Sequence, residues 1–343
     1  MMSKKEIISL IILVLVVGYG AWQYFHSSFT QTKSQHLMDT VVRITATSKS
    51  KNIGTRIDSV FAYIKLLEDK LNDYSEDSWL WKINNSDKTQ FTMDADIYNL
   101  LVISDSLYKM TNGAFDPTIK PVYDLWGFGS KPFDDADSLA NAVPDSLVLS
   151  KTLEQVGFDK LRFDSRTLHK PMGVQLAFGA IAKGYILDKA REYMKSLGII
   201  SGNIDCRSSM TFYGASLPQQ VYIQHPMLSQ DDYIASFKIL NKSVGTSGNY
   251  QQFFELNGVR YHHILDPRTG YPVPSVYSCT VIHPSAAWAD GLSTALVLVP
   301  PDRAIELARS IKDCDAVIYF DQDGSTVSLK TMGMKDIGFS EKI

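Results

Sequence analysis

Cysteine is scarce in this sequence, and neither sign of charge dominates. Only Cys206, Cys279 and Cys314 occur among the 343 residues. This odd, scattered set excludes a disulfide framework, and no two cysteines have the spacing of a zinc site, so we expect buried, apolar thiols. The formal net charge is −3, with no basic stripe interleaved with aromatic residues. We therefore expect no nucleic-acid partner.

Internal repeats and low-complexity tracts are also absent, which excludes a repeat architecture. Hydrophobic residues make up 45% of the chain and charged residues 21%. These are the proportions of an ordinary globular protein, so the chain has enough apolar residues for a sizeable core.

The first 30 residues differ from the rest. Lys4 and Lys5 precede IISLIILVLVVGYGAW, an apolar run over residues 7–22 that is long for a signal-peptide core and slightly short for a full bilayer span. We predict an uncleaved membrane anchor, with a cleaved signal segment as the alternative. The lysines should stay in the cytoplasm, which would place residues 31–343 on the periplasmic side of the inner membrane. No cysteine follows the run, so lipoprotein attachment is excluded.

Hydrophobic periodicity predicts two helices early in the following region. Apolar residues recur at spacings of three and four over residues 53–71, which places them on one helix face. These residues are Ile53, Ile57, Val60, Phe61, Ile64, Leu67 and Leu71. A second helix is predicted over residues 94–110, ending before Asn112-Gly113. The alternating stretch DTVVRITAT, residues 39–47, predicts a strand, and about ten polar residues before it indicate a linker.

The remainder mixes strands and helices irregularly. Strands are predicted over residues 173–179, 210–214, 220–225, 236–240, 242–248 and 277–283, with a last strand over 315–320. Helices are predicted over residues 181–197, 285–299 and 301–311, and residues 129–147 indicate a polar surface excursion with a short helix. This order favours an α+β fold of mixed, mainly antiparallel sheets with packed helices, in a single large domain over residues 31–343.

The stretch TNGAFDPTIKPVYDLWGFG, residues 111–129, combines glycines with aromatic residues. Glycine lets a planar ligand approach the backbone, and exposed aromatic rings can stack on it. The alternative is a well-packed loop over the core.

Two helical motifs carry polar groups suited to phosphate and metal. In GAIAKGYILDKA, residues 179–190, glycines frame Lys183 near a helix N-terminus, an arrangement that suits a phosphate; a solvated surface lysine is the alternative. In SAAWADGLSTALVL, residues 285–298, Asp290 and Thr294 share one helix face. Their oxygens could bind Mg²⁺; the alternative is a charge at the helix N-terminus with a back-bonded threonine.

The stretch RYHHILDPRTGYP, residues 260–272, places adjacent histidines before a tight turn. If this segment is extended, the rings of His262 and His263 face opposite sides, so only one can point into a given site. We predict that His263 is a general base aimed by the turn at Asp266-Pro267 and that His262 is structural; a plain loop histidine is the alternative.

Together these stretches resemble the ApbE family of FAD:protein FMN transferases, in content and in order. The similarity runs from about Leu37 to the C-terminal helices. The matching stretches are MDTVVRI, LNDYSEDSWLWKIN, TNGAFDPTIKPVYDLWGFG, FGAIAKGYILD, VGTSGNYQQFFELNGVRYHHILDPRTGYPV and ADGLSTAL. The resemblance implies an ApbE-like, T-fold-like α+β domain that transfers FMN from FAD, its substrate, to a threonine or serine of a target flavoprotein.

The resemblance also implies that AMP is released, that Mg²⁺ bridges the pyrophosphate, and that the target carries an Asp-Gly-x-Ser/Thr-Gly-Ala-Ser/Thr acceptor motif. His263 would take the proton of the acceptor hydroxyl. The flavin nucleotide would be lined by Met38, Tyr74, Ala114, Phe115, Asp116, Lys183 and the backbone around Ile264. The metal would be held by the Ala180 carbonyl, Asp290 and Thr294, with the Ser293 carbonyl as an addition. Two alternatives stay open: a flavin-storing protein without useful transfer, and a Mg²⁺-dependent pyrophosphatase that splits FAD into FMN and AMP.

The sequence departs from the family pattern in two places, a single residue and a three-residue turn. The family usually carries an aspartate at the nucleotide three residues before the metal-binding alanine, where this chain has Ala177. The family also commonly has a Gly-Gly-Asp turn where this chain has Arg207, Ser208 and Ser209. Serine hydroxyls and a guanidinium can still serve a phosphate or adenine, so the second departure indicates subfamily variation.

Substituting Ala177→Asp should tighten FAD binding, because it restores a charged hydrogen-bond acceptor worth about 1.5 to 3 kcal/mol, or roughly ten- to a hundredfold in Kd. Titrating FAD against the parent and variant proteins measures the change, and Ala177→Asn supplies an uncharged control of the same shape. Equal affinity in parent and variant would show that position 177 does not contact the nucleotide.

Overall fold

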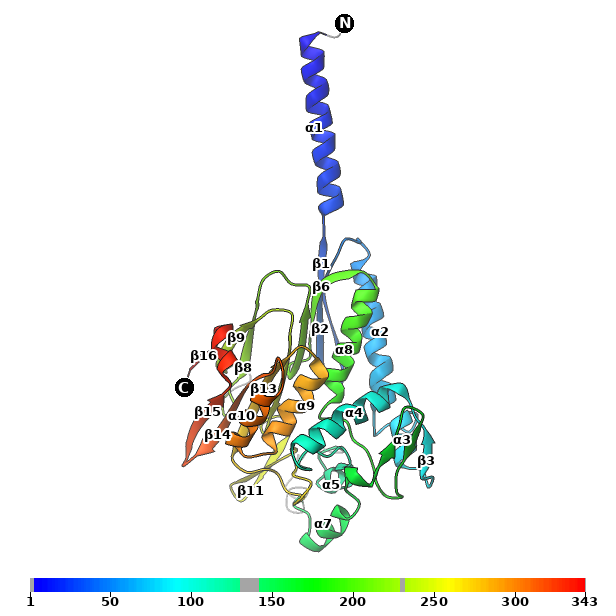
Figure 1. The fold of residues 1–343 in the computed structure, drawn as a ribbon, viewed down its shortest axis with the longest axis vertical. Helices are drawn as coiled ribbons and strands as arrows, with labels where there is room; N and C mark the ends of the chain where they lie inside the picture. The colour runs from blue at the N-terminus through cyan, green and yellow to red at the C-terminus, as the bar shows by residue number, and fades with distance from the viewer. Residues whose placement is uncertain (1–2, 130–141, 229–231, 343) are drawn as a thin grey trace.

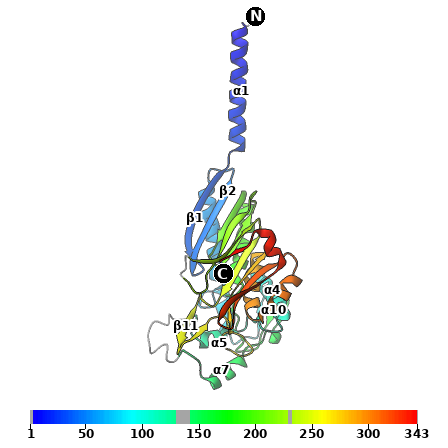
Figure 2. The same ribbon diagram turned by 90° about the vertical axis from the view of Figure 1, so that its left-hand side faces the viewer.

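The computed structural model describes residues 3–129, 142–228 and 232–342. Its centre is an eight-stranded sheet in which all neighbouring strands are antiparallel. In spatial order the strands are β1 (Phe29–Leu37), β2 (Thr40–Ser48), β6 (Ile199–Asp205), β7 (Ser209–Tyr213), β10 (Ser243–Gly248), β13 (Val276–His283), β14 (Asp315–Gln322) and β15 (Ser325–Lys330). The sheet forms the middle layer of the molecule (Figure 1, Figure 2).

Three smaller sheets surround this layer, and their named pairs are also antiparallel. One contains β8 (Gln219–Gln224), β9 (Tyr233–Ile239) and β16 (Ser340–Glu341), and a second contains β3 (Gln90–Thr92), β4 (Arg162–Phe163) and β5 (Thr167–His169). The third is the hairpin of β11 (Phe253–Leu256) and β12 (Val259–His262).

Some of the helices pack against the large sheet, others lie below it in the view of Figure 1, and α1 projects away from it. The helices are α1 (Lys4–His26), α2 (Ile53–Leu71), α3 (Trp79–Asn84), α4 (Ala95–Met110), α5 (Lys120–Leu125), α7 (Ser146–Leu153), α8 (Ala182–Ser196), α9 (Ala286–Val297) and α10 (Pro301–Ser310). Two 3₁₀ turns, Phe158–Lys160 and Met332–Ile337, complete the described elements.

Alternation along the central strands divides the core into two layers. On β14, Ala316 and Ile318 belong to the apolar cluster that also contains α2, α8, α9 and α10. The intervening Val317 and Tyr319 pack with Phe237 of β9 on the opposite face. Successive side chains of a strand point to opposite faces, so the large sheet is buried on both sides here. The predicted α+β class, with mainly antiparallel sheets and packed helices, is confirmed.

Helix α2 shows how closely local periodicity predicted some elements. It spans the predicted residues 53–71, and its buried positions are the seven predicted apolar residues. Helix α4 ends at Met110, and Asn112 and Gly113 both adopt positive φ, at 51° and 83°. The left-handed conformation ends the helix as the Asn-Gly pair predicts.

The prediction of a linker before residue 39 is wrong, because these residues form most of β1. Its nine residues pair in unbroken register with β2, from Phe29 opposite Ser48 to Leu37 opposite Thr40. The strand lies at the edge of the sheet, and most of its side chains are exposed. A polar composition therefore does not prevent pairing, since the backbone supplies the hydrogen bonds of an edge strand.

Two further strand predictions need correction. Residues 173–179 form no strand; only Gln175 makes a bridge, with Ile119. The backbone N–H and carbonyl of Leu176 bond instead to the side-chain amide of Asn84, at 2.8 and 2.7 Å. The strand at 315–320 is present as β14 but is not the last, because β15 and β16 follow. The predicted excursion over residues 129–147 lies mostly outside the described residues, which resume before α7.

Helix α1 projects from the body of the protein (Figure 1). The apolar side chains from Ile7 to Val17 are 45 to 65% exposed. Within residues 3–129, 142–228 and 232–342, no helix has the combination of length and apolar character needed to cross a membrane.

Candidate active site

A cavity of about 670 Å³ collects the predicted site residues. This volume lies within the range of about 300 to 1,000 Å³ typical of small-molecule sites. The predicted residues in its wall are Met38, Tyr74, Ala114, Phe115, Asp116, Ala177, Ala180, Lys183, His263, Ile264, Asp290 and Thr294. Ser293 is fully buried and does not line the cavity. Segments far apart in the sequence therefore meet around one space.

The close contact between α8 and α9 places Lys183 beside Asp290. The backbone N–H of Gly184, in the first turn of α8, donates to Asp290 Oδ2 at 2.8 Å, and Ser209 Oγ donates to Oδ1 at 2.8 Å. A Cβ at position 184 would lie 2.1 Å from the carbonyl oxygen of Ala286. Only glycine allows this approach without displacing α9.

Asp290 is a buried carboxylate, and its environment acts on it in two opposing ways. Burial raises its pKa, while the ammonium of Lys183 and the hydrogen bonds from Gly184 and Ser209 lower it. Lys183 itself is half-buried in the cavity wall, and its ammonium makes no hydrogen bond or ion pair with any described residue. Its charge is therefore available to an anionic ligand, as the phosphate interpretation predicts.

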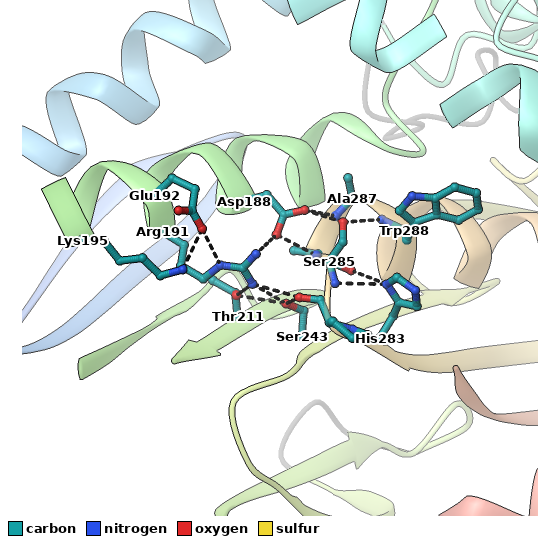
Figure 3. Close-up of polar contacts among 12 residues, drawn as sticks. Asp188, Arg191, Glu192, Lys195, Thr211, Ser243, His283, Ser285, Ala287 and Trp288 are labelled. Atoms are coloured by element: carbon teal, nitrogen blue, oxygen red, sulfur yellow. Dashed lines mark hydrogen bonds and ion pairs between the residues drawn. The ribbon is translucent and has the colours of Figure 1, made fainter. Parts of the chain in front are cut away.

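A second set of contacts joins α8 to the start of α9 (Figure 3). The carboxylate of Asp188 accepts from Ser285 Oγ at 2.5 Å and from the backbone N–H groups of Ala286 and Ala287 at 2.9 and 3.0 Å. An acidic side chain of one helix thus satisfies free N–H groups at the N-terminus of the other, where a negative charge is also favoured by the helix dipole.

Arg191 extends this contact to the sheet. Its guanidinium pairs with Asp188 at 2.8 Å and donates to Thr211 Oγ1, Ser243 Oγ and the Pro284 carbonyl, at 2.9, 3.3 and 3.0 Å (Figure 3). These partners lie on β7, on β10 and just after β13. The two helices that carry Lys183 and Asp290 are therefore fixed to the same part of the large sheet.

The oxygen atoms near Asp290 have the chemical character that Mg²⁺ prefers. Thr294 Oγ1 lies 2.7 Å from Ser247 Oγ, so the predicted alternative of a back-bonded threonine is wrong. Ser293 is the residue that bonds back, donating to the Asp290 carbonyl at 2.8 Å. The described ranges contain no group of three or more His, Cys, Asp or Glu side chains that could hold a metal. Any cation here would depend on one carboxylate with hydroxyl and carbonyl oxygens, a donor set that fits a hard cation.

The two adjacent histidines have separate surroundings. His262 ends β12 and is buried, with Nε2 2.9 Å from the Val273 carbonyl and Nδ1 accepting from the Ile264 N–H at 3.3 Å. His263 lines the cavity, and its backbone N–H and ring Nδ1 both lie near the Gln252 carbonyl, at 3.1 and 3.2 Å. The structure thus separates the two rings in the predicted way.

One detail of this segment differs from the predictions. His263 is held by hydrogen bonds that the Gln252 carbonyl accepts, whereas the turn at Asp266 is closed by its own bonds with Arg268 and Gly270. Ile264 lines the cavity as predicted; its N–H donates to His262 Nδ1, and its carbonyl accepts from Val273 N, both at 3.3 Å. Burial, with the neighbouring charges of His262 and Lys183, lowers the pKa of His263 to about 4. The imidazole is therefore neutral at pH 7.

Within residues 111–129, some side chains pack in the core and others line the cavity. Trp126 and Phe128 are 1% and 8% exposed and pack in a buried aromatic cluster with Phe254. For these two rings the predicted stacking role is wrong and the packed-loop alternative holds. Asp116 borders the cavity, but its carboxylate accepts from Thr118 N, Thr118 Oγ1 and Phe158 N, at 2.7, 2.6 and 2.9 Å. It therefore stabilises the loop that presents Ala114 and Phe115.

Tyr74 supplies an aromatic ring on the cavity wall. Lys120 Nζ lies 4.0 Å from the ring centroid and is itself paired with Asp73 and Asp124, at 3.2 and 3.0 Å. The Tyr74 hydroxyl donates to Asp124 Oδ1 at 3.2 Å. The cation beneath the ring and the carboxylate at its edge hold Tyr74 in place for stacking.

Several cavity residues escaped prediction from the sequence. Glu68 accepts from the Met38 N–H at 2.8 Å and supports a turn in which Met38 and Asp39 have φ of 53° and 57°. Tyr123 and Gln252 line the cavity near His263. Both residues lie inside stretches that resemble the family. Their contacts join segments far apart in the sequence, so no residue spacing predicts them. Arg207, noted only as a departure from the family pattern, lines the cavity with φ of 65°.

The fold and this cavity define a class of protein: a mainly antiparallel α+β domain with a nucleotide-sized site that combines an ammonium, a carboxylate and an imidazole. The same fold occurs in the ApbE protein of Thermotoga maritima, with a TM-score of 0.80, 28% identity, and coverage of 90% of this chain and 99% of that one. A model described as the ApbE family matches residues 38–318. The chain belongs to the ApbE family.

Curated relatives agree with this assignment. A Haemophilus influenzae protein named FAD:protein FMN transferase is 31% identical over 277 residues, which cover 77% of each chain. A Treponema pallidum protein of the same name is 28% identical over 312 residues, covering 84% of each chain. The similarity therefore extends over most of the domain, and the family match over residues 38–318 includes the segments that line the cavity.

Proposed function

We propose that this chain transfers FMN from FAD to a threonine or serine hydroxyl of a target flavoprotein and releases AMP. The observation that carries the proposal is the convergence of Lys183, His263, Asp290 and Thr294 on one cavity. The relatives named FAD:protein FMN transferase support flavin transfer as the reaction. The ring of Tyr74 and the backbone at Ala114 and Phe115 provide surfaces for the flavin nucleotide.

The chemistry follows from the charge state of each group. The neutral imidazole of His263 accepts the proton of the acceptor hydroxyl as its oxygen bonds to the FMN phosphorus. The bond from that phosphorus to the bridging oxygen breaks, and AMP leaves with the electron pair. Lys183 stabilises negative charge on the phosphate oxygens, and this electrostatic effect is the largest expected contribution of the chain.

The proposal also includes a Mg²⁺ ion bound in this cavity. The Asp290 carboxylate, the Thr294 hydroxyl and the Ala180 carbonyl would hold it, since all three residues line the cavity. The buried Ser293 is not a proposed ligand. Mg²⁺ bound there would supply further neutralisation of the diphosphate charge.

The direct test is to incubate the full chain with FAD, Mg²⁺ and a target carrying an Asp-Gly-x-Ser/Thr-Gly-Ala-Ser/Thr motif, then to determine the product masses. We expect the target to gain the mass of one FMN unit and AMP to appear in equal amount. A target with alanine at the acceptor position is the control. Free FMN and AMP without an adduct would identify a pyrophosphatase, and intact bound FAD without products would identify a storage protein.

His263→Ala should slow adduct formation by roughly a hundredfold or more while FAD still binds, because the base is lost but the phosphate and flavin contacts remain.

In the parent protein, the rate should stay flat as pH falls from 8 and then decline with a midpoint near the His263 pKa of about 4, since protonation removes the base. Rates of mass gain across pH measure both effects.

The matched control is His36→Ala, which changes an exposed histidine on the edge strand β1 and should keep the parent rate. A rate limb centred near the ordinary histidine pKa of about 6.5 would contradict the electrostatic argument. Loss of FAD binding in His263→Ala would assign this residue to ligand contact instead.

We also propose that the N-terminal segment anchors the protein at the inner membrane through the apolar surface of α1. Support comes from the exposed apolar side chains of α1 and from Lys4 and Lys5 at its start. The full chain should sediment with membranes and resist extraction at alkaline pH. Replacing Leu13 and Val14 with aspartate should release it, and recovery of the parent chain in the soluble fraction would refute the anchor.

A further inference from the structure

The position of His263 depends on one carbonyl group. The Gln252 carbonyl lies 3.1 Å from the backbone N of His263 and 3.2 Å from its ring Nδ1. Gln252 immediately precedes β11, and His263 immediately follows β12; the first residue of β11, Phe253, pairs with His262. The contact thus lies at the open end of the hairpin, where the regular ladder stops.

This carbonyl determines which ring nitrogen can act as a base. A carbonyl oxygen only accepts hydrogen bonds, so a neutral imidazole bonded to it through Nδ1 must carry its proton there. The lone pair then lies on Nε2, which has no hydrogen-bond partner among the residues that the structure describes. If the ring lost this contact, the other tautomer would place the proton on Nε2 and remove the acceptor.

Gln252 lines the cavity and is exposed, but its side chain is held by a hydrogen bond. The hydroxyl of Tyr123 donates to Gln252 Oε1 at 2.9 Å. The Tyr123 ring lies 5.9 Å from Phe128, whose side chain is 8% exposed. The hydroxyl bond therefore connects an otherwise solvated residue to the buried aromatic cluster.

The helix that carries Tyr123 also contacts Tyr74, another residue of the cavity lining. On α5, Lys120 lies beneath the Tyr74 ring, and Asp124 accepts from the Tyr74 hydroxyl. At the end of α5, Trp126 Nε1 donates to the Gly270 carbonyl at 2.7 Å. One short helix thus contacts the aromatic wall, the residue that orients His263, and the turn that follows His263.

We propose that Tyr123 and Gln252 are positioning residues for His263. Tyr123 holds Gln252, and the Gln252 carbonyl keeps the proton of the neutral ring on Nδ1 so that Nε2 can accept the proton of the incoming hydroxyl. This inference rests on the proposed function for its kinetic consequence, but the tautomer itself is a property of the protein alone.

The test is Tyr123→Phe in the full chain, which removes the hydroxyl and keeps the ring. With histidine labelled by ¹³C and ¹⁵N, the ring chemical shifts of His263 report its tautomer at pH 7. The parent should show the Nδ1–H form, and the variant should show a substantial Nε2–H population. The kcat for FMN transfer should fall about 10- to 100-fold, by analogy with the loss on removing a group that orients a metal-binding histidine, with little change in KM for FAD.

Tyr261→Phe is the matched control. Tyr261 packs against Trp126 and Phe254 in the same aromatic cluster, at centroid distances of 5.6 and 5.3 Å, but within the described residues it makes no hydrogen bond to Gln252 and does not line the cavity. Its loss should leave the tautomer and the rate unchanged. Gln252→Met should reproduce the effect of Tyr123→Phe, and the double variant should be no slower than the slower single one, because both changes break the same contact.

The outcomes separate this inference from the proposed reaction. An unchanged His263 tautomer in Tyr123→Phe, with the protein folded and binding FAD, would overturn the positioning role. Additive rate losses in the double variant would also overturn it. A parent protein that shows no FMN transfer, but whose tautomer changes in Tyr123→Phe, would refute the proposed function and leave the positioning role supported.

Discussion

The site depends on the contact between the start of α8 and the middle of α9. Asp290 is buried, and a buried carboxylate is costly unless hydrogen bonds and a nearby cation compensate for lost water. The Gly184 N–H, the Ser209 hydroxyl and Lys183 provide this compensation. Because glycine is the only residue that fits between the helices, the backbone that stabilises the carboxylate also sets the position of Lys183.

Other residues of the cavity lining are positioned by long-range hydrogen bonds and by aromatic packing. Here Tyr74, Tyr123 and His263 come from separate segments, and each is oriented by a hydrogen bond to Asp124 or Gln252. The buried charge of Lys120 and the aromatic cluster around Trp126 support them from behind. The cavity lining thus combines charged groups on helices with aromatic and imidazole groups, which matches a ligand with an anionic centre and a planar ring system.

Predictions from the sequence succeeded where the signal was local. The seven apolar positions of α2 depend only on a period of 3.6 residues, and the end of α4 depends only on an Asn-Gly pair. They failed where a partner decided the outcome. The polar β1 became a strand because β2 offers an unpaired edge, and residues 173–179 did not, because Asn84 binds the backbone there. Trp126 and Phe128 are core residues because β11 and β12 fold over them.

The sequence by itself determined the kinds of chemical group present: an ammonium at a helix start, a carboxylate and hydroxyl on one helix face, and two histidines with opposed rings. Motif spacing carries this information because it reflects local backbone geometry. Only the tertiary structure decided that these groups share one cavity, that Ser293 lies outside it, and that His263 is oriented by Gln252. The physical reason is that a backbone carbonyl is the same for every residue, so its choice of partner leaves no trace in residue type.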